Sequence, residues 1–598
     1  MDTAKQRKLT PNLSPAGAWA FALGTSIGWG SLVVTANTYL AQAGPWGSTL
    51  GMAFATVIML LIARNYSYLM QIFPEAGGAY AYSREIFSHD QGFLTGWFLA
   101  LTYMAVLWAN ATSIPLYARN FLGGVFSFGK MYTIFDYDVY AGEVIVTIIA
   151  ILLSGFLCAR FRDAAMWAMT ILVCLFTVGI AVVFLAALFL HKGTYSPGYI
   201  PDSAALSQII RIAVISPWAF IGFENISHAS EELAFQKTKV FRVFVAAVIS
   251  TALLYIFITV LSVTAYPDRY DSWLAYIRDL GNLHGLEAFP AFYAASCYLG
   301  RAGVGLLMLS LLALVVTSLI GNTTALSRLL YAMGRDEILP ARFGTIGPHG
   351  APATAVMAIA VVSSFVPLVG RTAIGWIVDV TTIGATLIYA FVSAAALKIA
   401  QEREDRIETV TGGIGLAAMI GFGLLNLLPN LVSTSNMERE TFFLFIVWSI
   451  LGFIFFRMIL RRDRKQRFGR SIVVWVALLS LVLLIALIWM RQSLVESNDL
   501  LLRNINDYYA AAPEGNGGTS DVQYIVDQVA LLRISNARTM LLGAGLFAFA
   551  ILIMLTNHFY MNMRSAEHER AANVDPMTGV KSKHAYILRE NQINNEIE

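Results

Sequence analysis

The chain has 598 residues, of which 57% are hydrophobic and only 13% are Asp, Glu, Lys or Arg, against about 25% charged residues in an average soluble domain. A soluble protein of this length would divide into several domains and cover each with charge, so a water-soluble enzyme and a disordered chain are both excluded. The formal net charge of +3 is too small to indicate a nucleic-acid partner. We expect the three cysteines, Cys158, Cys174 and Cys297, to be buried hydrophobic residues rather than a disulfide frame or a metal site.

Along the chain, about fourteen apolar stretches are long enough to cross a bilayer, which needs about 20 residues of α-helix. The sequence therefore predicts an all-α polytopic membrane protein of about 14 transmembrane helices. The predicted spans are 16–43, 45–73, 92–121, 141–159, 164–190, 209–235, 241–266, 303–333, 353–369, 374–398, 412–428, 442–458, 472–490 and 540–554.

The positive charges predict how these spans are oriented. Lys and Arg gather in alternate loops, which is typical of loops that stay in the cytoplasm. The N-terminal segment carries Lys5, Arg7 and Lys8, and the stretch 457–470 carries seven Lys and Arg residues, whereas the link between the first two spans carries none. The first apolar run is too long for a cleavable signal peptide. We expect a multi-pass protein of the cytoplasmic membrane with both termini in the cytoplasm.

The first and sixth spans are interrupted by helix-breaking residues. Span 1 contains Gly28 and Gly30, and span 6 contains Pro217 and Gly222 beside Glu224. The two spans are five apart, so they begin two five-helix units, and because five is odd the second unit is inverted. Paired breaks of this kind point to a transporter site near the bilayer midplane, where freed backbone groups must line a cavity or bind a ligand. The sequence predicts a 5+5 inverted repeat with broken helices 1 and 6, plus four further helices.

Four segments, in this order on these spans, resemble the amino acid permeases of the amino acid–polyamine–organocation (APC) superfamily. Each segment alone is a weak signal, and the four together are specific. The resemblance covers roughly residues 13–457. The segments are Gly24–Gly30, Pro74–Tyr82, Trp218–Glu224 and Arg328–Pro340.

The resemblance implies a transporter of amino acids or derived amines that needs no cofactor and is driven by a proton gradient, a sodium gradient or exchange. Helix N-termini suit a carboxylate, and unwound carbonyls suit an ammonium group. By resemblance, backbone N–H groups would bind the carboxylate and backbone carbonyls the ammonium. The N–H groups belong to Gly28, Trp29 and Gly30, and the carbonyls belong to Ser26, Trp218, Ala219 and Ile221.

Two departures from the family pattern bear on the substrate. Trp29 stands where the family usually has a small residue, and Asn322 stands where arginine/agmatine-exchanging members have an aromatic residue. Both argue against arginine, so we expect a neutral amino acid. Asn110 aligns with a site residue of the family. For Asn110 and Asn322 two interpretations stay open, contact with the substrate or hydrogen bonding between helices.

Glu224 is the candidate for ion coupling. An ionisable group inside an apolar span is costly and indicates a functional site, so we expect Glu224 to exchange a proton, with His228 receiving it. Glu231 and Glu232 would continue the same helix face from His228. Alternatively, these two are solvated at the cytoplasmic mouth or pair with Lys237. Sodium coupling stays open.

The last part of the chain lies outside the usual twelve spans. We expect a permease at 1–460, a two-helix membrane addition at 461–564 with an extracellular helical loop at 491–538, and a cytoplasmic tail at 565–598. The tail stretch Asp575–Tyr586 resembles the opening of a diguanylate cyclase (GGDEF) domain. The chain stops before any catalytic motif, so no cyclase activity is expected.

Two functions follow from these observations. The first is secondary transport of an amino acid by alternating access, with membrane lipid as the surroundings and an unspecified oligomeric state. The alternative is an amino-acid-binding sensor that signals through the C-terminal addition.

Overall fold

The structure is a computed structural model that describes residues 9–573 apart from 135–136, 194, 202, 371–372, 428–438, 464–466, 470–472 and 512–518. By its internal contacts the chain divides into two compact units. The first consists of Met1–Thr441 and Phe456–Ser471, and the second of Phe442–Phe455 and Ile472–Glu598.

The first half of the chain contains the first broken helix and a short β-hairpin. The antiparallel hairpin β1–β2, which pairs Lys130 with Tyr140, was not expected from the sequence. In order, the elements are α1 (Pro15–Ser26), α2 (Gly30–Val34), the π-helix η1 (Thr35–Leu40), α3 (Ala41–Ile72), α4 (Ala79–Ile86), α5 (His89–Phe121), β1 (Lys130–Ile134), β2 (Tyr137–Tyr140), α6 (Ala141–Arg160) and α7 (Arg162–Leu190).

The second half begins with the other broken helix. Its helices are α8 (Ala205–Ile215), α9 (Pro217–Phe220), α10 (Asn225–His228), α11 (Val240–Leu261), α12 (Trp273–Arg278), α13 (Pro290–Arg335), α14 (Ala353–Ser363), α15 (Ala373–Glu402), α16 (Arg406–Leu427), α17 (Arg439–Arg462), α18 (Val473–Ala511) and α19 (Thr519–Asn573). Short 3₁₀ turns η2 to η7 lie at Ser230–Glu232, Lys237–Lys239, Leu280–Asn282, Gly285–Ala288, Ala341–Gly344 and Val366–Val369.

The predicted spans coincide with helices. Within the described residues, ten helices are long and apolar enough to cross a membrane, and the shorter apolar helices Ala205–Ile215 and Ala353–Val369 add to them. The prediction of an all-α polytopic membrane protein is confirmed. Span boundaries moved where a glycine bends the chain, as at Gly300, whose φ of +57° kinks α13 just before the predicted start of span 8.

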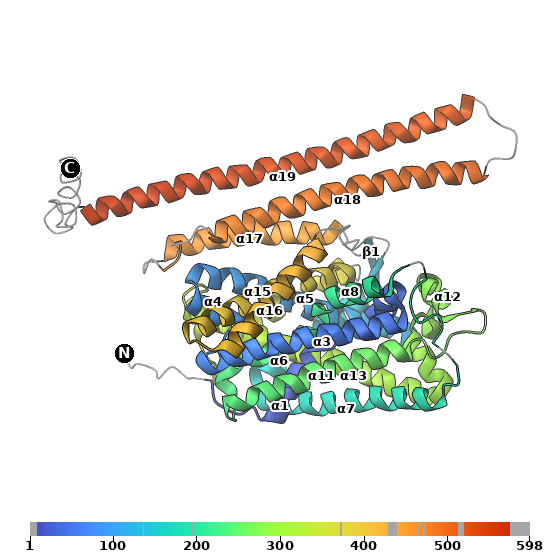
Figure 1. Ribbon diagram of the computed structural model, residues 1–598, viewed down its shortest axis with the longest axis horizontal. Coiled ribbons are helices and arrows are strands. Elements are labelled where there is room, and N and C mark those ends of the chain that lie inside the picture. Colours follow the sequence, from blue (N-terminus) through green and yellow to red (C-terminus); the bar gives the residue numbers. More distant parts are fainter. Residues whose placement is uncertain are drawn as a thin grey trace. The chain divides into compact units, whose positions relative to one another are not determined.

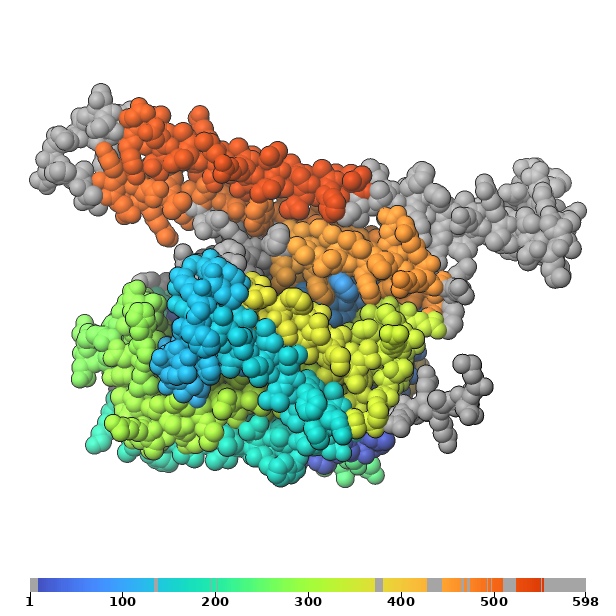
Figure 2. Space-filling model, turned by 180° about the vertical axis from the view of Figure 1, so that it is seen from behind, coloured from blue at the N-terminus to red at the C-terminus, as the bar shows by residue number. Residues whose placement is uncertain are grey.

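In the first unit, α3, α7, α11 and α13 run side by side (Figure 1). Figure 2 shows α6 and α7, cyan to teal, as an exposed band on one face of the molecule. This band carries exposed apolar side chains, among them Ile149, Leu153 and Trp167. Such a surface suits lipid, since lipid tails are as apolar as these side chains.

The lipid-facing surface corrects the prediction for the cysteines. Cys158 is buried as expected, but Cys174 and Cys297 are exposed. Cys174 lies on α7, a helix that buries one side only. Burial in a membrane protein is shared between protein and lipid, so an apolar sequence position does not have to face the protein interior.

Both predicted helix breaks are present. Helix α1 ends at Ser26, and Ile27 adopts an extended conformation (φ −106°, ψ 129°) before the helix resumes at Gly30. Helix α9 ends at Phe220, and Gly222 has φ +118° before α10 begins at Asn225. Only glycine takes this φ without strain. A Cβ atom on Gly222 would also lie 2.6 Å from the Thr25 carbonyl carbon, so the two breaks are in close contact.

In the second unit, α18 and α19 lie side by side as two long helices (Figure 1). Tyr508 stacks on Tyr524 at 4.1 Å between ring centroids, and Asn504 Nδ2 donates to Gln528 Oε1 at 3.0 Å. The helical segments expected within 491–538 are continuous with spans 13 and 14. The expected turn at 513–518 and the GGDEF-like stretch at 575–586 lie outside the described residues.

Candidate functional site

The candidate site is centred on the contact between the two helix breaks. The Thr25 hydroxyl lies 2.9 Å from the carbonyl oxygen of Gly222, and the Ser26 hydroxyl lies 3.2 Å from that of Phe220. Both hydroxyls also reach the Ala22 carbonyl in their own helix, at 3.0 and 2.9 Å. Side chains at the end of α1 therefore contact backbone carbonyls of the second break, which also accept the N–H groups of Phe223 and Asn225 at 3.1 and 3.0 Å.

The residues that lead from the first break into α2 meet Asn110 of α5. The Trp29 N–H donates to Asn110 Oδ1 at 2.9 Å, and Asn110 Nδ2 donates to the Val106 carbonyl at 2.9 Å. A Cβ atom on Gly28 would lie only 2.2 Å from Asn110 Oδ1. The structure thus brings together Gly28, Trp29 and Asn110, with the amide oxygen of Asn110 against the Trp29 N–H.

Aromatic side chains surround the breaks. The Trp218 ring passes over Gly30, where a Cβ atom would approach it to 3.1 Å, and packs edge-on against Tyr255 at 5.7 Å. The Trp29 indole is buried and lies edge-on to Phe289 at 5.6 Å. Trp29 therefore fills space beside the first break.

The residues expected to bind an ammonium group lie around the second break. The Trp218 carbonyl accepts the Ile221 N–H at 3.2 Å. Ala219 and Ile221 are buried beside it. Together with Ser26 across the contact, these four expected residues are close to one another.

Glu224 lies at the end of the second break with both of its carboxylate oxygens hydrogen-bonded. Tyr103 of α5 donates to Oε1 at 3.0 Å, Tyr389 of α15 donates to Oε2 at 3.0 Å, and the Gly222 N–H donates to Oε2 at 2.9 Å. Glu224 is buried, and its neighbour His228 has Nε2 3.0 Å from the Tyr103 hydroxyl. We call Glu224, Tyr103, Tyr389 and His228 the Glu224 cluster.

The two tyrosines of the Glu224 cluster were not predicted from the sequence. They lie on the third and tenth spans, far from Glu224 along the chain. The one signal in the sequence was that each tyrosine places a hydroxyl group within an apolar span. Tyrosine is common in such spans, so this signal does not single out Tyr103 or Tyr389.

The side-chain amide of Asn322 makes two hydrogen bonds within its own helix, α13. Its Nδ2 donates to the carbonyl and hydroxyl oxygens of Ser318 at 2.9 and 3.1 Å. Its Oδ1 is buried with no hydrogen-bond partner among the residues that the structure describes. The adjacent Thr324 contacts Cys158 of α6 at 3.6 Å, which is a contact between helices.

The predicted stripe of Glu231 and Glu232 along one helix face is wrong. The helix ends at His228, and residues 230–232 form a 3₁₀ turn, so the helical spacing on which the prediction rested does not apply. Glu231 pairs with Arg335 Nη1 at 2.9 Å and accepts the Ala76 N–H at 3.1 Å. Glu232 turns the other way, into the protein.

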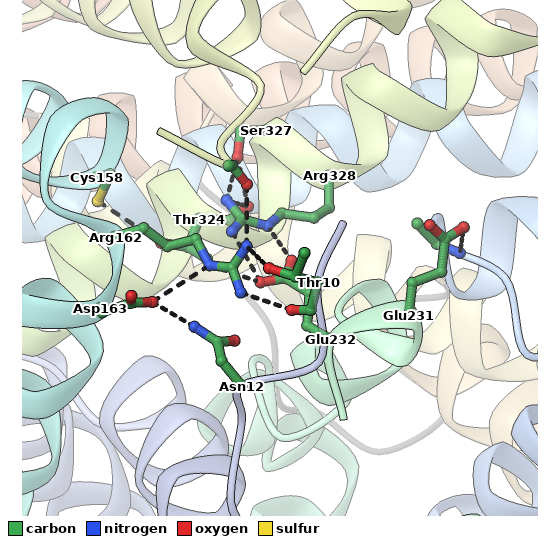
Figure 3. A network of polar contacts seen from close by, with 12 residues as sticks. Thr10, Asn12, Cys158, Arg162, Asp163, Glu231, Glu232, Thr324, Ser327 and Arg328 are labelled. Carbon is green, nitrogen blue, oxygen red and sulfur yellow. Dashed lines mark hydrogen bonds and ion pairs between the residues drawn. The ribbon is translucent and has the colours of Figure 1, made fainter. Parts of the chain in front are cut away.

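Glu232 is held by two buried arginines (Figure 3). Arg328 of α13 binds it through Nε at 2.8 Å and Nη2 at 3.2 Å, and Arg162 of α7 brings Nε to 3.4 Å. The exposed fractions of the three side chains are 5%, 1% and 5% for Glu232, Arg328 and Arg162. We call these three residues the Glu232 cluster.

The Glu232 cluster also fixes the segment that precedes α1. The Glu232 carbonyl accepts the N–H groups of Asn12 and Leu13 at 2.9 Å each, and Arg162 Nη2 donates to the Thr10 carbonyl at 2.8 Å (Figure 3). Two buried guanidinium groups face the buried Glu232 carboxylate here, and Arg162 Nε also lies 3.8 Å from the carboxylate of Asp163, whose side chain is 84% exposed. Glu232 is therefore the buried counter-charge of the cluster.

No group of three or more His, Cys, Asp or Glu side chains within the described ranges is placed to hold a metal ion.

Comparisons with known proteins agree on one family. A family model described as amino acid permease matches residues 13–451. The branched-chain amino acid permease BcaP of Bacillus subtilis (strain 168) is 21% identical over 477 residues, covering 77% of this chain and 96% of that protein. The low-affinity putrescine importer PlaP of Escherichia coli (strain K12) is 23% identical over 427 residues, covering 69% and 86%. The methylthioribose transporter of Bacillus subtilis (strain 168) is 25% identical over 358 residues, covering 58% and 72%.

Proposed function

The chain belongs to the amino acid permease family, a family of transporters rather than enzymes, and we propose that it moves neutral amino acids by alternating access around its two helix breaks. The observation that carries the proposal is the contact of the breaks, with Thr25 against Gly222 and Ser26 against Phe220. Backbone N–H and carbonyl groups of two interrupted helices then lie together within one membrane protein, and such groups can bind the two ends of an amino acid.

The geometry favours a substrate without a side-chain charge. The Trp29 N–H donates to Asn110 Oδ1. In the substrate-bound protein, a carboxylate oxygen of the substrate would replace Asn110 Oδ1 as the acceptor. The rings of Trp218 and Trp29 supply apolar surface near the breaks. Glu224 accepts three hydrogen bonds within the protein, so its carboxylate is not free to pair with a substrate cation.

Competition for uptake tests the substrate class. Purified full-length protein in proteoliposomes is given labelled leucine, with unlabelled valine, arginine, putrescine or methylthioribose as competitors. We expect valine to compete and arginine and putrescine to compete poorly, because a second positive charge would be buried without a partner. Stronger competition by putrescine than by valine would overturn the neutral specificity.

We propose further that Glu224 couples transport to protons. A buried carboxylate is costly, so the protonated form is the cheaper one when the site is dry, and release follows when water reaches the site. Glu224→Gln keeps the shape and removes the titration. We expect this variant to retain exchange of leucine but to lose the acceleration of uptake by an inward proton gradient.

The competing role for Glu224 is structural, since its Oε2 accepts the Gly222 N–H and so holds the break. Under that role Glu224→Gln keeps the response to the proton gradient. Replacing sodium by choline in the same assay separates sodium coupling from proton coupling. Glu287→Gln, at an exposed ion pair with Arg269, is the matched control and should behave as wild type.

One observation favours a second function, that of a sensor. Helices α18 and α19 have 39 and 55 residues, or roughly 58 and 82 Å at about 1.5 Å per residue. Both are longer than a bilayer crossing of about 30 Å requires. A protein that only sensed its ligand would bind leucine and move none.

For its location, we propose the cytoplasmic membrane with both termini in the cytoplasm, which rests on the distribution of Lys and Arg.

A further inference from the structure

We propose that the Tyr103 hydroxyl passes the transported proton between His228 and Glu224. This inference rests on the proposed proton coupling through Glu224 and adds the route. Tyr103 has its hydroxyl 3.0 Å from Glu224 Oε1 and 3.0 Å from His228 Nε2. The exposed fractions of the three residues are 0%, 2% and 1%, so bulk water does not reach between them.

The hydroxyl of Tyr103 has one hydrogen and can donate to only one of its two neighbours. In the first arrangement Glu224 is ionised, Tyr103 donates to it, and His228 donates to Tyr103 from Nε2. In the second arrangement Glu224 is protonated and donates to Tyr103, which donates to Nε2 of His228, whose hydrogen is then on Nδ1. Glu224, Tyr103 and His228 form a row of hydrogen bonds, and both arrangements satisfy every contact in this row.

The two arrangements differ by one proton. To pass from the first to the second, Nδ1 of His228 gains a proton, Nε2 gives its hydrogen to the Tyr103 oxygen, and Tyr103 gives its own to Glu224. Three bonds to hydrogen form and two break, so the row takes up one proton and requires no other reactant. The reverse sequence releases a proton from Nδ1.

His228 Nδ1 is the end atom of the row on the side away from Glu224. It is buried and has no hydrogen-bond partner within the described part of the chain, and the same holds for the side-chain amide of Asn225 and the hydroxyl of Ser230 on the same segment. Buried polar atoms are normally hydrogen-bonded, so unpartnered ones are exceptions that call for a role. In the proposed route a proton reaches Nδ1 past these unpartnered polar atoms at 225 and 230.

Gly78 leaves the room that the His228 ring needs. Its φ is +52°, and a Cβ atom there would lie 3.0 Å from His228 Cε1 and 2.4 Å from the Ser227 hydroxyl. The ring also packs edge-on against Tyr103, with centroids 5.3 Å apart. The histidine is therefore positioned from both sides.

Other titratable groups near the row do not replace it. They are Tyr66 of α3, Tyr82 of α4, Tyr389 of α15 and Arg328 of α13. Arg328 is paired with Glu232. Tyrosine has an ordinary pKa of about 10, so these hydroxyls do not store protons near neutrality. Glu224 is the group of the row that holds the extra proton, and His228 stays neutral in both arrangements.

The test compares Tyr103→Phe and His228→Gln with Glu224→Gln in proteoliposomes holding the full chain. Leucine counterflow without a gradient reports substrate translocation, and uptake driven by an inward proton gradient reports coupling. We expect Tyr103→Phe and His228→Gln to slow proton-driven uptake by about 100-fold, the low end of what a positioned proton donor contributes, and to leave counterflow within about twofold of wild type. Tyr298→Phe, which removes a hydroxyl bonded to the Thr264 carbonyl, is the matched control and should resemble wild type.

The outcomes separate the relay from the coupling on which it rests. If Tyr103→Phe and His228→Gln keep the gradient response while Glu224→Gln loses it, the relay is overturned and the role of Glu224 stands. If Glu224→Gln also keeps the response, proton coupling through Glu224 is itself overturned. If counterflow is lost in both relay variants, Tyr103 and His228 have a structural role and the relay is overturned.

Discussion

Replacing Glu232 by glutamine should destabilise the protein more than replacing its principal partner, Arg328. In the Glu232 cluster two guanidinium groups face one carboxylate, and the three side chains are at most 5% exposed. Glu232→Gln leaves two buried cations beside a neutral amide, and among the described residues only the exposed Asp163 carboxylate, 3.8 Å from Arg162 Nε, still pairs with Arg162. Arg328→Gln leaves one cation and one anion, because Arg162 Nε remains 3.4 Å from Glu232.

The magnitude follows from the burial. Removing one partner of a buried ion pair costs about 3–5 kcal/mol, since the remaining charge is left without compensation. That cost applies to Glu232→Gln through Arg328, whereas Arg162 keeps a weak pair with the exposed Asp163. Arg328→Gln loses two hydrogen bonds from Arg328 to Glu232 but leaves the cluster electrically neutral, so its cost should be smaller. In the double variant Glu232→Gln/Arg328→Gln, Arg162 still donates to the carbonyls of Thr10 and Gly350. We expect its free energy of unfolding to lie between those of the two single variants.

Thermal unfolding of the purified full-length variants in one detergent measures the order. Glu287→Gln serves as the control, because its ion pair with Arg269 is exposed and such pairs contribute about 0–1 kcal/mol. We expect Tm to fall in the order wild type and Glu287→Gln, then Arg328→Gln, then Glu232→Gln. A Tm for Arg328→Gln as low as that for Glu232→Gln would refute the charge argument and would assign the stability to the packing of Arg328.

Two further predictions concern the substrate site and the tail. Gly28→Ala places a Cβ atom 2.2 Å from Asn110 Oδ1, so it should displace Asn110 and abolish the rise in Tm that leucine produces by binding the native state; an unchanged rise would contradict the assigned carboxylate site. Deleting Ala571–Glu598 should leave leucine uptake intact, because the segment is mostly polar and lies outside the permease match at 13–451. A loss of uptake by a deletion variant that still reaches the membrane would favour a regulatory tail.

Much of the fold could be predicted because the bilayer simplifies the problem. A lipid-exposed span must satisfy its own backbone, so each long apolar stretch had to be a helix. The helix breaks could be predicted from the same rule, because Gly28 and Gly222 are helix-breaking residues within apolar spans that would otherwise form continuous helices. The β1–β2 hairpin escaped prediction because it lies in a connection between spans, where neither rule applies.

The site was predicted less completely because it depends on packing between distant helices. Glu224 stood out as a charge in an apolar span, but Tyr103 and Tyr389 reach it from the third and tenth spans, and no spacing along the chain connects them. The prediction for Glu232 failed because it assumed that the helix continues beyond His228. The helix ends there, and the turn that follows sends Glu232 to Arg328 instead of along the Glu224 face.

The proposal that this chain carries amino acids by alternating access is tested most directly by leucine counterflow. Proteoliposomes holding the full-length protein are loaded with unlabelled leucine, and labelled leucine is added outside with no ion gradient. A transporter exchanges one for the other, so we expect labelled leucine to accumulate transiently inside above its external concentration and then to decline. Saturable leucine binding to the purified protein, with no accumulation of label in the vesicles, would contradict transport and identify the chain as a sensor.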